Sequence, residues 1–297
     1  MSAPPRIVAV GEVLWDLLPN GDQLGGAPAN FAHHARVLGN TVHLISRVGR
    51  DRLGDRLLNH LEQNHLDTSL VQRDSEAATG TVSVQIRQGG HPDYTIHENV
   101  AWDRIAIASE SDNVTAQCDA ICFGTLAQRH PLSRTTILHL LNTAPPSAKR
   151  VFDVNLRQHF YSEEIIRTSL KHTSLLKLND DELPVIADAV GFSGSDDVIA
   201  RSLIEKYSLE VVALTRGSAG STLFSRNQRS DLPAPIITVQ DTIGAGDSFT
   251  AALLTGLLQG KPLNECHHLA SSLSAWVCTQ IGATPFPPPS LLQSLNI

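Results

Sequence analysis

Two acidic residues flank a short glycine turn in the C-terminal part of the chain, in the segment Asp241-Thr242-Ile243-Gly244-Ala245-Gly246-Asp247. The apolar run 236–239 before it predicts a buried strand, and the Ala- and Leu-rich stretch 248–258 after it predicts a helix. A glycine turn at a helix N-terminus is suited to bind phosphate, because the first N–H groups of the helix have no partner within it.

The residue types of this turn divide the chemistry between backbone and side chain. Gly244, Ala245 and Gly246 would let phosphoryl oxygens approach the backbone amides closely. Asp247 is negatively charged, so we expect it to accept the proton of an attacking hydroxyl rather than to bind phosphate. Phosphoryl transfer through a loose transition state requires positioning more than a strong base, so an aspartate suffices. The alternative is a capped helix with an acid in its first turn and no ligand.

A second pair of glycines precedes another predicted helix. Gly25 and Gly26 lead into a helical stretch that has Pro28 near its start and Gly39 after its end. The two glycines permit close backbone approach to a ligand, and Asn30 in the first helical turn would face the same space. A glycine-rich loop before a capped helix is the alternative interpretation.

The segment Asp153-Val154-Asn155-Leu156-Arg157 lies at the C-terminal end of a predicted strand. Open α/β sheets bind their ligands at this end of the strands. The guanidinium of Arg157 offers a planar fork for a phosphate or for sugar hydroxyls. A surface arginine paired with an acid is the alternative.

Asn179 and Glu182 end another predicted strand and begin a helix, and their spacing of three places them on one face of its first turn. Oxygen ligands at this spacing can hold Mg²⁺ directly or through water. The same two residues also satisfy the pattern of a capping box, so both interpretations stay open.

Alternating apolar runs and helical stretches surround these segments. From residue 120 onward this alternation predicts an α/β fold, with a mostly parallel sheet flanked by helices on both faces. Residues 79–87 alternate apolar and polar side chains, Gly89-Gly90 predicts a turn, and 94–97 predict the returning strand of a hairpin. We therefore predict a single domain over residues 1–297, with a small antiparallel β lid formed by segments 12–27 and 79–103.

Composition excludes several classes of function. The net charge of −7 without a basic cluster argues against nucleic acid or an anionic membrane as partner. The chain has no apolar run of about 18 residues, and residues 1–6 lack the apolar centre of a signal peptide. The four cysteines have no metal-binding spacing. We expect a cytoplasmic enzyme.

Four separated blocks resemble the ribokinase-like (PfkB) carbohydrate kinases. DTIGAGDSF is similar to the C-terminal signature of that family, and GEVLWDLLP with GGAPANFAHHARVLG is similar to its N-terminal signature. The segments around 153–157 and 179–182 match its DxNxR and NxxE patterns. The resemblance implies a ribokinase-like fold that transfers phosphate from ATP to a sugar hydroxyl with Mg²⁺.

The resemblance also implies roles for individual residues on the sugar side. Sugar hydroxyls would be held by Asp16, Gly25, Gly26 and Asn30, with Asn155 and Arg157 as substrate or phosphoryl contacts. Lid side chains that could touch the substrate are Tyr94, His97, Asn99 and Trp102. Closure of the lid would exclude water, which competes with the sugar for the phosphoryl group. His33 and His34 are expected to be surface or core residues of their helix rather than ligands.

On the nucleotide side, the implied ATP contacts are Asn179, Thr215, Gly217, Ser218, Gly220, Thr242, Ser274 and Gly282. Asn179 and Glu182 would organise Mg²⁺, directly or through water. Asp241 is a candidate ligand of a monovalent cation such as K⁺, which many relatives bind near this loop.

The N-terminal signature and the block FDVNLRQHF are most similar to the bacterial fructokinases of the family. We therefore expect phosphorylation of D-fructose to fructose 6-phosphate, with 2-keto-3-deoxygluconate, ribose or a nucleoside as alternative acceptors. A non-catalytic sugar-binding regulatory protein on the same fold is the alternative of another class. Exposed lid strands with an apolar face would suit a homodimer.

Overall fold

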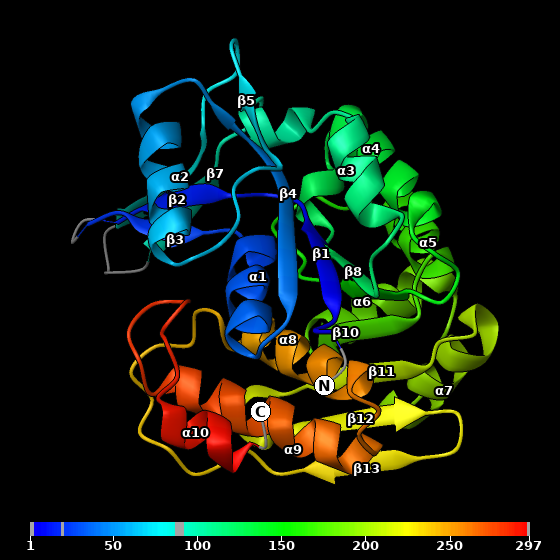
Figure 1. The fold of residues 1–297 in the computed structure, drawn as a ribbon. Coiled ribbons are helices and arrows are strands. Elements are labelled where there is room, and N and C mark those ends of the chain that lie inside the picture. Colours follow the sequence, from blue (N-terminus) through cyan, green and yellow to red (C-terminus); the bar gives the residue numbers. More distant parts are fainter. Residues whose placement is uncertain (1–2, 19–20, 87–91, 296–297) are drawn as a thin grey trace.

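The structure, a computed structural model, describes residues 3–18, 21–86 and 92–295. A nine-stranded sheet forms the middle layer, and helices cover both of its faces (Figure 1). A separate four-stranded sheet lies beside this body. The predicted turn at Gly89-Gly90 falls outside the described residues.

The large sheet has the strand order β13-β12-β11-β10-β9-β8-β1-β4-β5. Its strands are β1 (Arg6–Val10), β4 (Thr41–Gly49), β5 (Val71–Asp74), β8 (Ala120–Phe123), β9 (Lys149–Asp153), β10 (Leu175–Asn179), β11 (Val211–Thr215), β12 (Ser221–Ser225) and β13 (Arg229–Leu232). All neighbouring pairs from β11 to β5 are parallel, whereas β12 pairs antiparallel with both β11 and β13. The mostly parallel sheet that the sequence predicts is confirmed.

Alternate side chains of each central strand pack into two separate cores. In β1, Ile7 and Ala9 belong to the core on one face, and Val8 and Val10 belong to the core on the other. The helices that pack into the first core are α1 (Ala27–Val37), α2 (Arg52–Gln63), α8 (Ala245–Leu258) and α9 (Leu263–Cys278). Those that pack into the second are α4 (Pro131–Thr143), α5 (Glu163–Lys171), α6 (Glu182–Val190) and α7 (Asp196–Tyr207). Burial of both strand faces explains the continuous apolar runs of the sequence.

The remaining helical elements are short. They are the helices α3 (Ser109–Thr115) and α10 (Pro289–Ser294) and the 3₁₀ turns η1 (Ala101–Arg104), η2 (Leu126–Gln128) and η3 (Gly217–Ala219).

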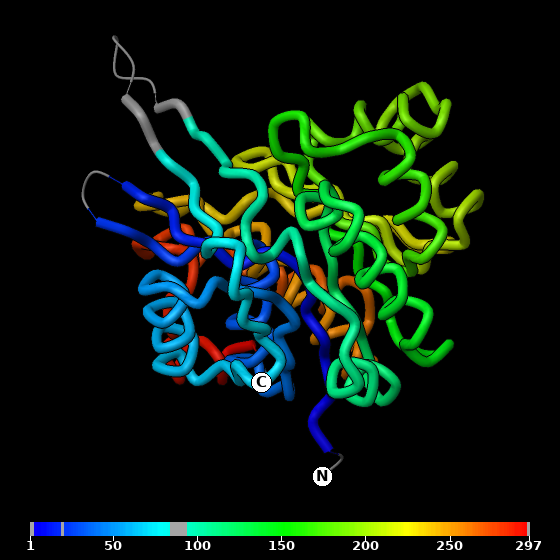
Figure 2. Tube along the Cα trace, turned by 90° about the horizontal axis from the view of Figure 1, so that it is seen from above, coloured from blue at the N-terminus to red at the C-terminus, as the bar shows by residue number. Residues whose placement is uncertain are grey.

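The small sheet has the order β3-β2-β6-β7, with β2 (Leu14–Leu17), β3 (Gln23–Gly25), β6 (Gly80–Ile86) and β7 (Pro92–Ile96). Its outer pairs are antiparallel hairpins, and the central pair β2–β6 is parallel because the two hairpins come from distant segments. Figure 2 shows these strands projecting from one side of the body. All four strands lie within the segments 12–27 and 79–103.

The predicted buried strand at 236–239 is wrong. Residues 233–239 have no regular secondary structure, and the side chains of Ile236 and Val239 are exposed. β13 ends at Leu232, and Pro233 and Pro235 lack the N–H groups that a continuing strand would donate to its neighbour. An apolar run alone does not distinguish an extended surface segment from a strand.

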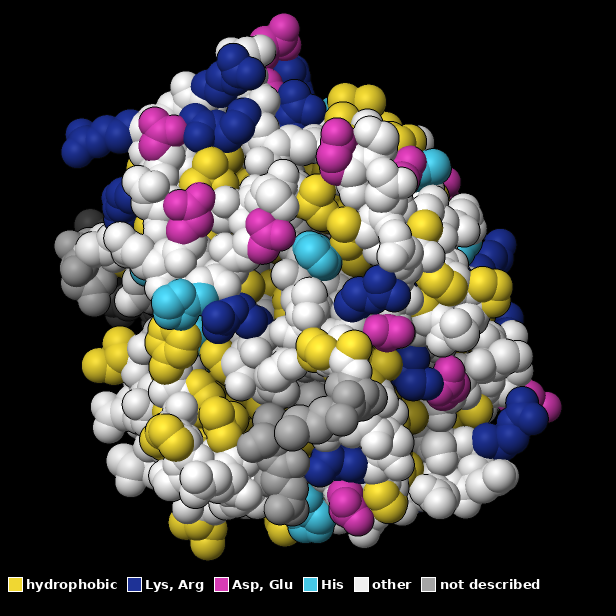
Figure 3. Space-filling model, in the orientation of Figure 1, with side chains coloured by type: hydrophobic (Ala, Val, Ile, Leu, Met, Phe, Trp, Pro, Cys, Tyr) yellow, Lys and Arg dark blue, Asp and Glu magenta, His cyan; other side chains and the backbone are white. Residues whose placement is uncertain are grey.

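Charge is mixed on the surface of the molecule. Around α2 and β5, arginine side chains lie among acidic ones on the face shown in Figure 3, and Arg73 and Arg104 form ion pairs there with Asp55 and Glu76. Within residues 3–18, 21–86 and 92–295, no helix is long and apolar enough to cross a membrane.

Asp51 joins α2 to the base of the small sheet. Its Oδ1 accepts hydrogen bonds from Gly54 N at 2.8 Å and from the Thr79 hydroxyl at 2.7 Å, and its Oδ2 accepts from Thr79 N at 2.8 Å. Thr79 directly precedes β6, so one carboxylate caps a helix of the body and fixes the first strand of the second hairpin.

Replacing Asp51 with Ala should therefore destabilise the protein by about 2–3 kcal/mol, because a helix cap and two contacts to Thr79 are lost together. The matched control is Asp55→Ala, which removes an exposed ion pair with Arg73 and should cost less than about 1 kcal/mol. Urea denaturation of both variants measures the difference. Equal effects of the two changes would contradict the role of Asp51.

Candidate active site

A hydrogen bond joins the two signature segments of the sequence. Asn30 Nδ2 donates to Asp247 Oδ2 at 2.9 Å, although the two residues are 217 positions apart. Asn30 lies in the first turns of α1 and Asp247 in the first turn of α8, and these helices pack against each other. Asn30 is buried, and its Oδ1 has no hydrogen-bond partner within the described chain. The contact brings a candidate sugar ligand and a candidate base into one site.

The turn before Asp247 requires glycine at Gly244 and brings a buried lysine against Gly246. Gly244 caps α8 with a φ of 79°, and a Cβ there would lie 2.4 Å from the Ala283 carbonyl oxygen. A Cβ on Gly246 would lie 2.9 Å from Lys177 Nζ. The backbone N–H groups of Ala245, Gly246 and Asp247 therefore begin the helix with no side chain beyond Cβ before Asp247. This geometry can hold an anion.

Asp247 retains some solvent contact at the mouth of the site, although protein surrounds its carboxyl. Burial is the largest cause that raises its pKa, and the charge of Asp153 adds to the effect. The Asn30 hydrogen bond and the charges of Lys177 and Arg157 lower it, which leaves a pKa of about 6. Asp247 is therefore ionised at neutral pH and still able to accept a proton near that pH.

Lys177 and Asp153 form a buried ion pair beneath this turn that sequence reasoning missed. Lys177 Nζ donates to Asp153 Oδ1 at 3.1 Å, and each residue is 6% exposed. The Thr250 hydroxyl lies 2.7 Å from Asp153 Oδ2 and 3.0 Å from the Gly246 carbonyl oxygen. The pair thus ties the ends of β9 and β10 to the first turns of α8. The sequence signal for this ion pair is the lysine inside the apolar run 175–178.

Glu12 is a second residue that the sequence analysis did not single out. It follows β1, is 3% exposed, and its Oε2 has no partner in the part of the chain that the structure describes. Burial raises its pKa to about 7, and the charge of Arg157 opposes this increase. A Cβ on Gly26, whose φ is 109°, would lie 2.5 Å from the Glu12 carbonyl oxygen. Gly26 therefore allows α1 to begin directly against β1.

Asp16 and Gly25 lie diagonally across the β2–β3 hairpin, in which Gly25 pairs with Leu14 and Asp16 with Gln23. A Cβ on Gly25 would lie 2.5 Å from Asp16 Oδ2, so the Asp16 carboxylate packs directly against this glycine. Burial raises the pKa of Asp16 to about 6, and Arg157 lowers it. Asp16 thus carries a partly desolvated carboxylate on the small sheet, with Arg157 close enough to affect its charge.

Arg157 is exposed and lies near three carboxyls. Its charge lowers the pKa of Glu12, Asp16 and Asp247, and among the residues that the structure describes its guanidinium donates only to the neighbouring Leu156 carbonyl oxygen, from Nη1 at 3.0 Å. Asn155 has a positive φ of 44°, which turns the chain sharply after β9. The guanidinium is therefore placed at the mouth of the site with most of its donors available.

Asn179 and Glu182 form the reciprocal hydrogen bonds of a capping box, one of the two interpretations of this segment. Glu182 N donates to Asn179 Oδ1 at 2.8 Å, and Asn179 N donates to Glu182 Oε2 at 2.8 Å. Leu156 N donates to Glu182 Oε1 at 2.9 Å, so both oxygens of this buried carboxylate accept backbone hydrogen bonds. Within the described residues, no group of three or more His, Cys, Asp or Glu side chains could hold a metal ion.

The candidate nucleotide-binding residues near the glycine turn form hydrogen bonds with it. The Ser274 hydroxyl donates to the Ala245 carbonyl oxygen at 2.9 Å, and Gly282 N donates to Asp241 Oδ2 at 3.1 Å. Asp241 Oδ1 accepts from Ile243 N at 3.0 Å. Thr242 is exposed, and its carbonyl oxygen accepts from Ala245 N at 3.3 Å. The Asp241 carboxylate thus holds the start of the turn next to the segment around Gly282.

The other candidate nucleotide residues lie in the turn between β11 and β12. Thr215 ends β11 in register with Asn179, and Gly217, Ser218 and Gly220 follow it. A Cβ on Gly220, whose φ is 91°, would lie 2.2 Å from the Leu232 carbonyl oxygen. These residues occupy the same edge of the sheet as Asn179.

The lid residues divide into exposed and buried ones. His97 and Asn99 are exposed at the end of β7, and His97 Nε2 lies 2.6 Å from the Ser83 hydroxyl. Tyr94 is 52% exposed. Trp102 is fully buried, with the Arg129 guanidinium stacked over its ring at 3.9 Å, so the suggested substrate contact of Trp102 is wrong. Its ring packs beneath Gly80, where a Cβ would lie 2.2 Å from the indole nitrogen.

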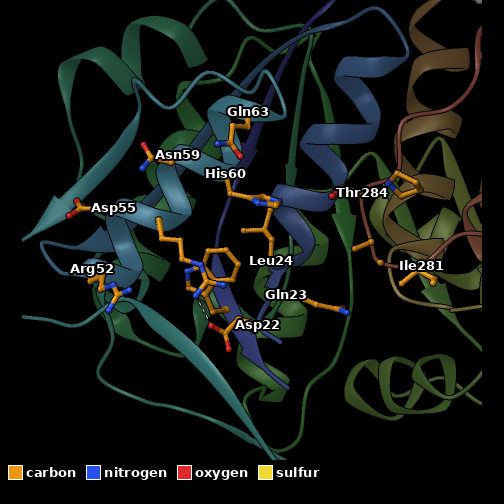
Figure 4. Close-up of a pocket in the computed structure, with 15 residues that line it drawn as sticks. Asp22, Gln23, Leu24, Arg52, Asp55, Asn59, His60, Gln63, Ile281 and Thr284 are labelled. Carbon is orange, nitrogen blue, oxygen red and sulfur yellow. Dashed lines mark hydrogen bonds and ion pairs between the residues drawn. The ribbon is translucent and has the colours of Figure 1, made fainter. Parts of the chain in front are cut away.

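A cavity of about 780 Å³ lies next to this arrangement, between α2, β3 and residues 281–285. Figure 4 shows Arg52, Asn59 and Gln63 on α2, with Thr284 on the opposite side. The cavity borders Gly282 but Asp247 does not line it. The catalytic candidates therefore lie outside this cavity.

The sequence matches the family model described as pfkB family carbohydrate kinase over residues 20–290. A protein of Pyrococcus horikoshii named as a sugar kinase is 30% identical over 276 residues, which cover 87% of this chain and 84% of the relative. The fructokinase of Klebsiella pneumoniae is 30% identical over 266 residues, covering 85% and 84% of the two chains.

Solved structures show the same fold. The Pyrococcus horikoshii protein in complex with ATP superposes with a TM-score of 0.83 at 26% identity, covering 97% of this chain and 99% of that one. A fructokinase of Vibrio cholerae with bound fructose, ADP and calcium has a TM-score of 0.82 at 20% identity, with 99% of each chain covered. The ribokinase-like architecture that the sequence predicts is confirmed.

The carboxyl of Asp247 should titrate near pH 6 instead of its ordinary 3.8. Asn30→Leu should raise this pKa further, because the Asn30 N–H stabilises the charged form of the carboxyl. The ¹³Cγ chemical shift of Asp247, assigned through its loss in Asp247→Asn, measures both values. A wild-type pKa below about 5, or a lower pKa in the variant, would refute this electrostatic description.

Proposed function

Because this chain belongs to the pfkB family of carbohydrate kinases, we propose that it transfers the terminal phosphoryl group of ATP to a hydroxyl of D-fructose, giving fructose 6-phosphate. The observation that carries this proposal is the contact of Asn30 with Asp247 at the N-terminus of α8. It places a polar side chain suited to a sugar, a carboxylate suited to a proton and a turn suited to phosphate in one site.

The reaction follows from these positions. The acceptor hydroxyl oxygen bonds to the terminal phosphorus, the bond from that phosphorus to the bridging oxygen breaks, and the hydroxyl proton moves to an Asp247 carboxylate oxygen. ADP leaves with the bridging oxygen. The amides of Gly246 and Asp247 at the start of α8 stabilise the charge on the transferring group, while the Ala245 amide donates to the Thr242 carbonyl oxygen within the turn. The buried Lys177 ammonium lies beneath Gly246, where Asp153 balances its charge.

The sugar is held from three directions in this proposal. Asp16 accepts hydrogen bonds from the small sheet, Asn30 offers its unpartnered Oδ1 from α1, and Arg157 donates from the loop after β9. Gly25 and Gly26 would contact the sugar through their backbone, because the space where a Cβ would lie is filled by the Asp16 side chain and by the Glu12 carbonyl oxygen. Asn155, His97 and Asn99 lie at the rim as further candidate contacts.

For ATP we propose the turn after β11 together with Thr242, Ser274 and Gly282, which border the glycine turn. Mg²⁺ would neutralise phosphate charge. Because both oxygens of Glu182 already accept backbone N–H groups, the fit is through water, with Asn179 and Glu182 orienting the ion's hydration shell. A K⁺ site at Asp241, a lid formed by 12–27 and 79–103, and a homodimer through that lid remain predictions.

The acceptor is tested by ADP release from MgATP with fructose, tagatose, ribose, glucose, 2-keto-3-deoxygluconate, adenosine and inosine. We expect fructose to give the highest kcat/KM. Faster turnover of another acceptor would support the kinase activity but contradict fructose as the substrate. Sugar binding without turnover of any acceptor would favour a non-catalytic regulatory protein.

Asp247→Asn should lower kcat by about 100- to 10,000-fold, because the proton acceptor is lost while the amides of the turn remain. The affinity for MgATP, measured by calorimetry, should stay within about twofold of wild type. Stability should not fall, since the change removes a desolvated charge. The matched control is Asp188→Asn on the exposed face of α6, which should leave kcat unchanged. An Asp247→Asn enzyme of normal kcat would sink the assignment.

A further inference from the structure

Two consecutive histidines of α1 are buried, and none of the chemistry above uses them. His33 and His34 are 1% and 0% exposed, one turn after Asn30. Asn30 and His34 are four residues apart, so they lie on the same face of the helix. Asn30 contacts the Asp247 carboxylate, and His34 lies one turn further along the same face of α1.

His34 is bonded to the segment that covers the glycine turn. Its Nε2 lies 2.8 Å from the Ala283 carbonyl oxygen, in a buried contact. The same carbonyl group packs against Gly244, where a Cβ would lie 2.4 Å from the oxygen and 2.8 Å from Ala283 Cα. Gly282 N is bonded to Asp241 at the other side of the turn. A single peptide carbonyl thus touches both α1 and the cap of α8.

The protonation of His34 is fixed by its partner. A carbonyl oxygen can only accept, so Nε2 carries the hydrogen and donates it. Burial lowers the pKa of His34 to about 3, and the neighbouring His33 lowers it too, so the ring is neutral at ordinary pH. The contact is therefore a constant mechanical link rather than a pH switch.

His33 provides a matched comparison on the same segment. Its Nε2 lies 3.2 Å from the Pro285 carbonyl oxygen, and its ring packs edge-on against Phe286 with the centroids 4.9 Å apart. It is as buried as His34 but holds the segment two residues further from Gly244. Both histidines hold the segment 283–286, but only His34 contacts the carbonyl group that packs against the turn. Variants of the two residues can therefore distinguish these two roles.

We propose that His34 is a positioning residue that fixes the Gly244–Asp247 turn relative to α1 through the Ala283 carbonyl. The link sets the position of the phosphate-binding amides against the Asn30–Asp247 pair, so sugar and nucleotide meet at the reacting distance. The expected change in kcat rests on the proposed kinase function. The expected change in the mobility of the turn rests on the contacts alone.

The kinetic test uses His34→Leu, which removes the donor, and His34→Gln, which keeps an N–H group. With the wild-type enzyme's fastest sugar, His34→Leu should lower kcat roughly tenfold, as expected for a lost hydrogen bond to a buried carbonyl. His34→Gln should restore kcat to within about twofold of wild type. His33→Leu should lower thermal stability similarly while retaining kcat. Equal, near-wild-type kcat in both Leu variants would reduce His34 to core packing and overturn the proposal.

A second readout does not depend on turnover. Hydrogen exchange of the peptide 241–248 should become faster in His34→Leu but not in His33→Leu, because only the first change releases the carbonyl that packs on Gly244. Unchanged exchange in His34→Leu would also overturn the proposal, whether or not the protein phosphorylates a sugar. If His34→Leu does not fold, His34→Asn takes its place, since its amide is too short to reach Ala283.

Discussion

The site depends on one constraint: the Asp247 carboxylate must be desolvated enough to accept a proton, yet remain charged near neutral pH. Burial and the charge of Asp153 favour the neutral carboxyl, while Asn30, Lys177 and Arg157 favour the carboxylate. Asp153 ends β9 and Arg157 lies in the loop after it, whereas Asn30 belongs to α1 and Lys177 to β10. The balance therefore exists only when the parallel sheet brings the ends of β9 and β10 together with α1 and α8.

The same constraint explains why the glycines and the buried ion pair occur where they do. Gly246 allows the Lys177 ammonium to approach the first turn of α8, and Gly26 allows α1 to start against the end of β1. Thr250 connects Asp153 to the backbone of that turn, which fixes the carboxylate that opposes Lys177. The fold and the proposed site therefore depend on the same contacts, because the residues that pack around Asp247 also set the charge of this proposed proton acceptor.

Much of this arrangement could be predicted from the sequence, and the failures have physical causes. The alternation of apolar runs and helical stretches predicted the parallel fold, and the polar residues after strands predicted the edge at which the candidates gather. The run at Ile236 was assigned to a strand because periodicity does not register the missing N–H groups of Pro233 and Pro235. Glu12 was missed because its significance comes from distant partners, which no local pattern reveals. Lys177 interrupts an apolar run, but its partner Asp153 lies on another strand and cannot be identified from that run alone.

In the proposed reaction the phosphoryl group passes to a sugar hydroxyl and not to water. Phosphorus NMR of the protein with MgATP and fructose distinguishes these outcomes, because the sugar phosphate, inorganic phosphate and ADP give separate signals. We expect a sugar monophosphate signal that grows in step with ADP and little inorganic phosphate. Growth of inorganic phosphate with ADP, and no sugar phosphate from any acceptor, would contradict this proposal.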